Sequence, residues 1–225
     1  SKKMLIDLMG IKCKNWKTKL DNGMNADFDF FINKFSKLSK SIFVDVTASK
    51  QISMKTSKIL AKGTSVVTAS KIANSENQEY YDEIRVSEFI GNSQFKYETN
   101  VGAGLPIIET LKTLLDTGDK ILKIEGVLSG TLSYLFSEYD GSIPFSNLIK
   151  TAMKSGFTEP DPRIDLNGLD VSRKILILVR EIGEKIEIQD VFTNSLINEN
   201  IDPNISVNEF LNELGRYDDE FLSIY

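Results

Sequence analysis

Three carboxylates lie within the seven residues from Glu159 to Asp165. Pro160 and Pro162 fix the backbone φ angle at two positions of the same segment and stiffen the loop. Like charges held close together in a stiff loop repel one another unless a cation binds among them. The segment therefore predicts a site for a cation such as a substrate ammonium group. The alternative is a solvated acidic loop in which Arg163 is the local counter-ion.

Asp170 and Lys174 follow this loop and are four residues apart. At that spacing they share one face of a helix, and the apolar positions beside them predict partial burial. A partly buried lysine next to a carboxylate can transfer a proton. The alternative is a surface ion pair that contributes a few tenths of a kcal/mol. The pair begins only five residues after Asp165, which favours one shared site.

Histidine, the usual proton carrier near neutral pH, is absent from the sequence. Serine–histidine triads and HExxH metal sites are therefore excluded, and any proton transfer must use Lys, Asp, Glu or Tyr. The single cysteine, Cys13, cannot form an internal disulfide or a cysteine-rich zinc site.

The net charge of −5 argues against binding to nucleic acid or to an anionic membrane surface. No apolar run approaches the roughly 18 residues that a membrane-spanning helix needs. The first residues do not resemble a secretory leader. We therefore expect a globular protein of the reducing cytoplasm, with no nucleic-acid or membrane partner.

Alternating strands and helices must position these residues. Short β-branched and aromatic runs predict strands at 42–46, 65–68 and 95–98, and amphipathic patterns predict helices at about 51–61 and 76–88. This order is typical of a parallel α/β sheet, in which ligands bind at the carboxyl ends of the strands. Polar clusters follow each strand there: Thr47 to Ser49, Thr68 to Lys71, and Glu98 to Asn100. They predict one shared rim, and helix capping is the alternative.

The pattern changes near residue 100. A tight glycine loop, 101–106, opens a helix that runs to about residue 115. Inward carbonyls in the loop from Glu98 to Leu105 could hold a monovalent cation, although a plain turn is the alternative. Beyond it, the sequence predicts a strand at 120–128, helices at 129–139, 147–154 and 170–182, and an amphipathic helix around 210–214.

Five blocks of this sequence, taken together, resemble homoserine dehydrogenase. They are Val44–Ser49, Val66–Asn74, Glu98–Pro106, Gly126–Thr131, and Gly156–Arg163 with Asp165, Gly168, Asp170, Arg173 and Lys174. The likeness covers roughly residues 1 to 190. The opening, with Trp16 after Gly10-Ile11, is most similar to the dehydrogenase part of a bifunctional aspartate kinase–homoserine dehydrogenase.

The resemblance implies an α/β fold in two parts. Residues 1–100 would form a partial nucleotide-binding domain with an incomplete doubly wound, Rossmann-like parallel sheet. Residues 101–225 would form an α+β catalytic, substrate-binding and dimerisation domain. The implied reaction is NAD(P)H-dependent reduction of aspartate 4-semialdehyde to L-homoserine, on the route to threonine and methionine, in a homodimer or higher homo-oligomer.

The resemblance also implies roles for single residues. Lys174 would give the proton to the carbonyl oxygen, and Lys71 would lie between nicotinamide and substrate. Thr47 would contact the NADP or NAD cofactor. The remaining residues would bind substrate, namely Glu159 and Asp170 with Asp165 assisting, or hold a sodium ion through main-chain oxygens, namely those of Glu98, Val101, Ala103 and Leu105.

The chain departs from the family pattern in several places. No Gly-x-Gly-x-x-Gly occurs, so we expect that the phosphate-binding unit of about 30 residues lies outside this chain. The C-terminal segment that returns to the cofactor site is also expected to be missing, and weak or absent NAD(P) binding by this piece follows. Ala69-Ser70 replaces the usual Pro-Asn, and Ile164 stands where an aspartate is common.

Two other interpretations stay open. The chain could be a non-catalytic dimerisation or regulatory module derived from the enzyme, or another amino-acid dehydrogenase with a similar second domain. The intact set of Glu159, Asp165, Asp170 and Lys174 argues against the first.

Overall fold

The computed structural model describes residues 2–38 and 40–223 and divides them into two units. The first unit contains the chain up to Asp45, then Lys55–Val67 and Glu83–Lys96. The second contains Val46–Met54, Thr68–Asp82 and the chain from Tyr97 onward. The predicted division into folding domains at residue 100 stays a prediction.

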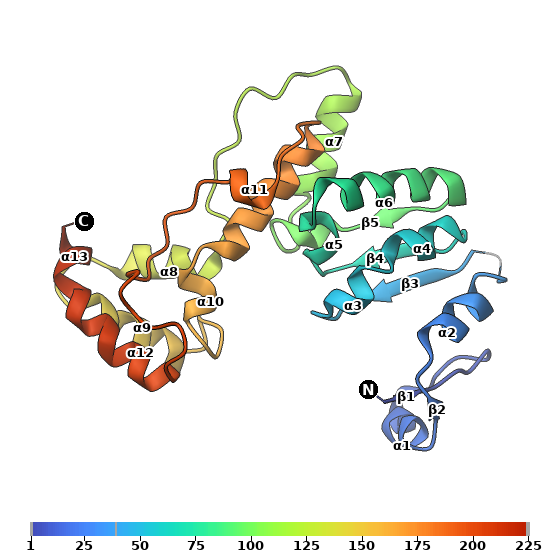
Figure 1. The fold of residues 1–225 in the computed structure, drawn as a ribbon, viewed down its shortest axis with the longest axis horizontal. Helices are drawn as coiled ribbons and strands as arrows, with labels where there is room; N and C mark the ends of the chain where they lie inside the picture. Colours follow the sequence, from blue (N-terminus) through green and yellow to red (C-terminus); the bar gives the residue numbers. More distant parts are fainter. Residues whose placement is uncertain (1, 39, 224–225) are drawn as a thin grey trace. The chain divides into compact units, whose positions relative to one another are not determined.

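A three-stranded sheet in the order β3–β4–β5 confirms the predicted Rossmann-like strands (Figure 1). The strands are β3 (Ile42–Asp45), β4 (Ser65–Thr68) and β5 (Phe95–Lys96). β4 and β5 pair in parallel, with Val66 opposite Phe95. The chain enters the second unit directly after β3 and β5, and at the last residue of β4. The polar clusters predicted at the strand ends therefore all belong to the second unit.

The helices between these strands differ in length from those predicted. The segment 51–61 forms two helices, α3 (Lys50–Ser53) and α4 (Thr56–Ala61), and Ser49 caps the first by accepting a hydrogen bond from Ile52 N–H. α5 (Ile72–Ser75) precedes α6 (Gln78–Gly91), which extends the helix predicted at 76–88.

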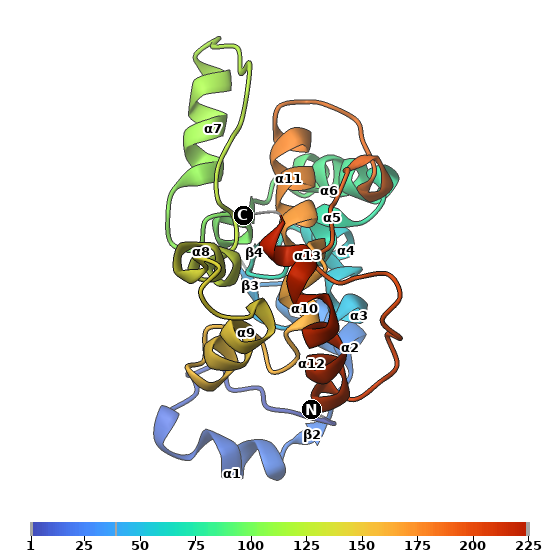
Figure 2. The same ribbon diagram turned by 90° about the vertical axis from the view of Figure 1, so that its left-hand side faces the viewer.

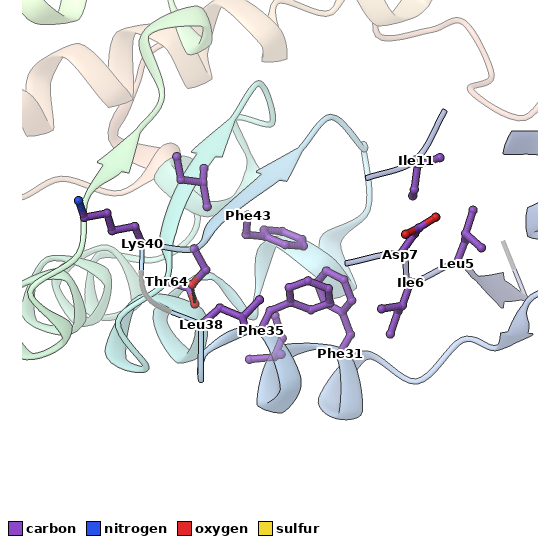
Figure 3. A pocket seen from close by; sticks show the side chains of 13 residues that line it. Leu5, Ile6, Asp7, Ile11, Phe31, Phe35, Leu38, Lys40, Phe43 and Thr64 are labelled. Atoms are coloured by element: carbon purple, nitrogen blue, oxygen red, sulfur yellow. Dashed lines mark hydrogen bonds between the residues drawn. The ribbon is translucent and has the colours of Figure 1, made fainter. Parts of the chain in front are cut away.

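The N-terminal part of the first unit has an aromatic centre. It comprises β1 (Lys3–Met4) paired antiparallel with β2 (Met24–Asn25), the short helix η1 (Cys13–Asn15), α1 (Trp16–Asp21) and α2 (Phe28–Phe35). The rings of Phe28 and Phe31 pack edge-on against Phe43 of β3. A pocket of about 460 Å³ lies beside this cluster, with Leu5, Ile6 and Ile11 facing it (Figure 3). Its lining is mostly apolar, and Asp7 and Lys40 are the charged residues among it.

Helices dominate the second unit and confirm those predicted beyond residue 100. They are η2 (Glu98–Asn100), α7 (Ile107–Asp116), α8 (Gly130–Glu138), α9 (Phe145–Lys154), α10 (Arg163–Leu166), α11 (Leu169–Glu181), η3 (Ile188–Asp190), α12 (Val207–Leu214), η4 (Gly215–Tyr217) and α13 (Asp218–Leu222). Figures 1 and 2 show α8, α9, α12 and α13 close together, and their buried residues form one hydrophobic core. Leu135, Phe145, Ile149, Phe210 and Leu214 of this cluster are each 0% exposed.

The strand predicted at 120–128 is wrong for this chain. The segment is extended but is not part of a sheet, because no described strand pairs with it. Leu122 is 86% exposed and Val127 is 76% exposed. One side of the segment borders an apolar groove of about 790 Å³ that also contacts Ile175 and Val179 of α11. Alternating apolar residues alone therefore do not make a strand, because a strand also needs a partner for its backbone hydrogen bonds.

Candidate active site

The first turns of α11 present the predicted proton-transfer pair. Gly168 precedes the helix with φ +74°, a conformation that favours glycine, and a Cβ there would lie 2.6 Å from Thr193 Cγ2. The helix then begins at Leu169, so that Asp170 and Lys174 lie one turn apart on one face. The local backbone of the Gly168–Leu169 junction therefore fixes where these two side chains start.

One carboxylate joins two lysines in this site. The Nζ of Lys174 lies 2.7 Å from Asp170 Oδ2, and the Nζ of Lys71 lies 3.0 Å from Asp170 Oδ1. The side chain of Lys174 is 15% exposed, that of Lys71 25% and that of Asp170 44%. Residues separated by about a hundred positions in the sequence thus form one cluster at the edge of solvent. We call Lys71, Asp170 and Lys174 the lysine–aspartate cluster.

Opposing effects act on the pKa of Asp170. Partial burial raises it, while hydrogen bonds from Lys174 and then Lys71, with their positive charges, lower it. The lysines prevail, so the pKa of Asp170 lies below its ordinary value and the carboxylate is charged at neutral pH. The cluster consequently carries two positive charges and one negative charge, which favours a substrate that develops negative charge.

A main-chain oxygen also orients Lys174. Its Nζ donates a hydrogen bond of 2.5 Å to the carbonyl of Leu128, just before the N-cap residue of α8, Ser129. An ammonium group has three N–H donors. The bonds to Leu128 and Asp170 use two of them, which leaves one for a substrate oxygen.

Asp165 organises the acidic loop from inside. One of its oxygens accepts from the Thr131 hydroxyl at 2.8 Å, and the other accepts from the Glu159 main-chain N–H at 2.9 Å. The Thr131 hydroxyl is also within 2.8 Å of the Phe157 carbonyl. These bonds fasten the loop to the start of α8, and they fix the backbone at Glu159, whose side chain is exposed. The structure does not bring the Glu159 side chain into direct contact with the lysine–aspartate cluster.

Arg163 neutralises one acid of this loop, as the simpler interpretation of the loop predicted. Its guanidinium forms a forked pair with Asp161, including Nη2 to Oδ2 at 2.7 Å. The hydrogen bond from Arg163 lowers the pKa of Asp161, against a smaller opposing effect of burial. Arg163 Nη1 also donates to the carbonyls of Pro203 and Ile205. Asp161 is therefore an internal partner of Arg163, and Glu159 is the acid of the loop that faces solvent.

Hydrogen bonds join the segments that follow the three strands, which supports the predicted rim. The hydroxyls of Ser53 and Ser70 lie 3.1 Å apart, and the Asn100 side chain donates to the Thr68 carbonyl at 3.4 Å. Thr47 belongs to the turn after β3, where its hydroxyl accepts from Ser49 N–H at 3.2 Å. Thr47 is not a member of the lysine–aspartate cluster.

The glycine loop before α7 has two features. The Glu98 carboxylate caps the helix by accepting from Ile108 N–H and Glu109 N–H at 2.8 and 3.0 Å. Gly102 and Ala103 have φ of +80° and +53°, which turns the backbone sharply and reorients its carbonyls. Among the described residues, no group of three or more His, Cys, Asp or Glu side chains is placed to hold a metal.

Two contributors to this site could not be predicted from the sequence. Thr131, which donates to Asp165, lies in a block that carried the resemblance but received no role. The Leu128 carbonyl leaves no signal in the sequence, because every residue has one.

In the same described regions, no helix is both long and apolar enough to cross a membrane.

Two family models match the chain. Residues 13–97 match the NAD-binding domain of homoserine dehydrogenase, and residues 106–216 match the homoserine dehydrogenase model itself. Every residue of the lysine–aspartate cluster falls within one of these two matches.

Curated relatives of this chain are named as homoserine dehydrogenases, alone or joined to an aspartokinase. A chloroplastic bifunctional aspartokinase/homoserine dehydrogenase 2 from Arabidopsis thaliana is 44% identical over 97% of this chain and 24% of its own length. The homoserine dehydrogenase of Schizosaccharomyces pombe is 39% identical over 97% of this chain and 60% of its own. The chain thus spans about a quarter of the bifunctional relative and three fifths of the monofunctional one.

Solved structures agree on the fold. A crystal structure of a Candida auris protein of unknown function matches with a TM-score of 0.85 and 35% identity, over 93% of this chain and 60% of that one. A hyperthermophilic archaeal homoserine dehydrogenase in complex with NADPH matches with a TM-score of 0.65 and 27% identity, over 76% and 54%.

Proposed function

The chain belongs to the homoserine dehydrogenase family, and from that membership we propose that it carries the substrate and proton-transfer site for NAD(P)H-dependent reduction of aspartate 4-semialdehyde to L-homoserine. The observation that carries the proposal is the lysine–aspartate cluster, which places an ammonium donor beside a charged carboxylate at the edge of solvent.

Lys174 is the proposed proton donor. When hydride adds to the aldehyde carbon with its electron pair, the carbonyl π bond breaks and negative charge develops on oxygen. The remaining N–H of the Lys174 ammonium stabilises that charge and delivers the proton, which yields the alcohol. Asp170 and the Leu128 carbonyl hold the ammonium in place, so that little reorganisation is needed.

Carboxylates and Lys71 are proposed to orient the substrate. Glu159 faces solvent from a loop fixed by Asp165 and Thr131, which suits recognition of the substrate ammonium group. Asp165 assists by holding this loop. Asp170 contributes a second carboxylate at the substrate, next to Lys71.

The cofactor is proposed to be NADP or NAD, bound in part by Thr47 and Lys71. Residues 13–97 match the family's NAD-binding domain. The hydroxyls and Lys71 that follow β4 in the parallel sheet supply donors that suit a nicotinamide nucleotide. When bound, the nicotinamide would supply the hydride.

A sodium ion is a further proposal for the glycine loop. The main-chain oxygens of Glu98, Val101, Ala103 and Leu105 would hold it, as carbonyl oxygens do for other monovalent cations. The left-handed turn at Gly102 and Ala103 fits such an arrangement. The ion would brace the start of α7. A higher melting temperature in sodium chloride than in choline chloride at equal ionic strength would support this, and equal values would contradict it.

We also propose that the enzyme is a homodimer or higher homo-oligomer joined through its second domain. The extended segment 120–128, with exposed Leu122 and Val127 and no described strand beside it, supports this assembly. The proposed setting is the cytoplasm and the route to threonine and methionine, next to an aspartate kinase domain as in the bifunctional relatives.

Steady-state assay of the natural full-length protein tests the function. We expect consumption of NADPH that depends on aspartate 4-semialdehyde, with homoserine as the product. Turnover of a different amino-acid aldehyde or keto acid instead would establish another amino-acid dehydrogenase. Absence of turnover in a folded protein, with dimerisation retained, would establish a non-catalytic module.

A further inference from the structure

Arg180, near the end of α11, is buried and fully engaged. Its side chain is 0% exposed. Nη1 donates to the carbonyls of Asn74 and Glu76 at 3.0 and 2.6 Å. Nε and Nη2 donate to the carbonyl of Ile186 at 3.2 and 2.9 Å, and Nη2 also donates to Glu187 Oε2 at 3.2 Å. These bonds occupy all five N–H donors of the guanidinium.

Two of these acceptors belong to the turn that carries Lys71. Lys71 is the N-cap residue of α5, which is only four residues long. Asn74 lies inside α5 and Glu76 directly follows it as the C-cap residue. A helix this short moves as one piece, so a bond to its last carbonyls also restrains the residue at its start.

The other end of α11 carries the reacting pair. Asp170 is ten residues before Arg180 on the same helix, or about 15 Å along its axis. α11 therefore touches α5 twice: once through the Lys71–Asp170 ion pair, and once through the Arg180 bonds to α5. The first contact is partly exposed and the second is buried, so the second is the more rigid.

We propose that Arg180 is a positioning residue that sets the separation between Lys71 and Asp170 by clamping α5 to α11. The inference rests on the proposed function for its kinetic consequence. The geometry itself depends only on contacts within the second unit.

The chemistry of the acceptors requires arginine. Four of the five bonds go to neutral carbonyls, and one goes to the partly exposed Glu187 carboxylate. Removing a guanidinium from water is costly unless its donors are satisfied, and a planar fork satisfies this spread of carbonyls. The ring of Tyr81 lies 5.3 Å from the guanidinium carbon and adds a cation–π contact. A lysine has three donors on one atom and cannot reach both α5 and Ile186.

A double-mutant cycle in the full-length enzyme tests the kinetic consequence. We expect Arg180→Lys to lower kcat ten- to a hundredfold with less than about a threefold change in KM, the effect of misplacing a group by about an ångström. In a Lys71→Met background the same substitution should cost less than about threefold, because the residue it positions is already gone. Equal losses in both backgrounds would contradict the proposal. Leu214→Ala, which destabilises the helical core without touching α5, is the control and should leave kcat near wild type.

Carbon-detected NMR titration of Asp170 in the full-length protein tests the geometry without any reaction. In Arg180→Lys, the displacement of Lys71 should raise the pKa of Asp170 toward its value in Lys71→Met. In Leu214→Ala, the pKa of Asp170 should not rise. An unchanged pKa would overturn the proposal. If Arg180→Lys does not fold, Glu187→Ala removes the one charged acceptor and should raise the pKa in the same direction; no rise there counts equally against it. A shifted pKa in a protein without dehydrogenase activity would remove the proposed function and leave the clamp standing.

Discussion

At the scale of single residues, the site depends on one carboxylate shared by two lysines. Asp170 contacts Lys71 and Lys174 at 3.0 and 2.7 Å, and Lys174 also donates to a main-chain carbonyl. The spacing of Asp170 and Lys174 was predictable because four residues make about one helical turn. The participation of Lys71 rested on the resemblance and on its place after a strand. The Leu128 carbonyl was unpredictable, because main-chain oxygens do not differ between sequences.

Replacing Lys174 separates catalysis from stability. We expect Lys174→Ala in the full-length enzyme to lower kcat about a thousandfold, since general acids contribute 10²- to 10⁴-fold. The free energy of unfolding should fall by less than about 2 kcal/mol, because one partly exposed ion pair and one hydrogen bond are lost. Steady-state kinetics and urea denaturation measure the two effects.

Lys185→Ala is a matched control, because Lys185 also pairs with an aspartate but is 75% exposed. It should leave both quantities near wild type. Near-normal turnover of Lys174→Ala would remove Lys174 from its role.

The lowered pKa of Asp170 gives stability a defined pH dependence. A carboxylate whose pKa is lower in the folded state stabilises the fold above its unfolded-state pKa, about 3.9, and loses that effect as pH falls through the folded-state value. The difference in unfolding free energy between wild type and Asp170→Asn should therefore shrink between about pH 5 and pH 2. Urea denaturation at several pH values measures it. Asp116→Asn, an exposed change on α7, should show less narrowing, and a constant difference for Asp170→Asn would refute the assignment.

At the scale of elements, sequence patterns located most helices and strands but not what completes them. Apolar periodicity predicted α9, α11 and α12 within a few residues, because each buries one face. Gly156 and Gly183, both with positive φ, follow the ends of α9 and α11. The break between α3 and α4 lacks such a signal. The segment 120–128 failed as a strand because hydrogen-bond pairing depends on a second segment, which its own sequence does not specify.

Gly91 marks a close approach between α6 and α4 that tolerates no side chain. A Cβ at Gly91 would lie 1.8 Å from the Leu60 main-chain carbonyl oxygen, so one helix must move. We expect Gly91→Ala to lower the unfolding free energy by about 2 kcal/mol or more. Chemical denaturation followed by circular dichroism measures this. Gly130→Ala, in helix α8 with nothing within 4 Å of the added carbon, should be neutral or stabilising by up to about 1 kcal/mol. Equal behaviour of the two variants would refute the packing argument.

At the scale of the whole molecule, the two halves of the proposed reaction are unequally represented. The lysine–aspartate cluster and the loop around Glu159 lie within the second unit. The chain has no Gly-x-Gly-x-x-Gly, the element that places backbone N–H groups on a cofactor pyrophosphate. The family could be predicted from the sequence because its motifs contain the residues proposed to carry the reaction. The arrangement of copies could not, because an interface is a property of two surfaces.

Cofactor affinity of the 225-residue chain should reflect that imbalance. We expect NADPH to bind it with a dissociation constant above the micromolar range, because it contains no Gly-x-Gly-x-x-Gly element to bind the cofactor pyrophosphate. Titration calorimetry with the chain, compared with the full-length protein, measures the difference. Micromolar or tighter binding by the chain alone would contradict this expectation.

The hydrogen bond from Lys174 to the Leu128 carbonyl has an evolutionary consequence. A side-chain partner presents a mutational target, since a single codon change deletes it. A peptide oxygen presents none, because every amino acid at position 128 supplies the same atom. As far as this contact is concerned, the residue at position 128 can therefore change, provided that the backbone path is kept. Selection on the contact conserves the backbone geometry rather than the amino acid at position 128.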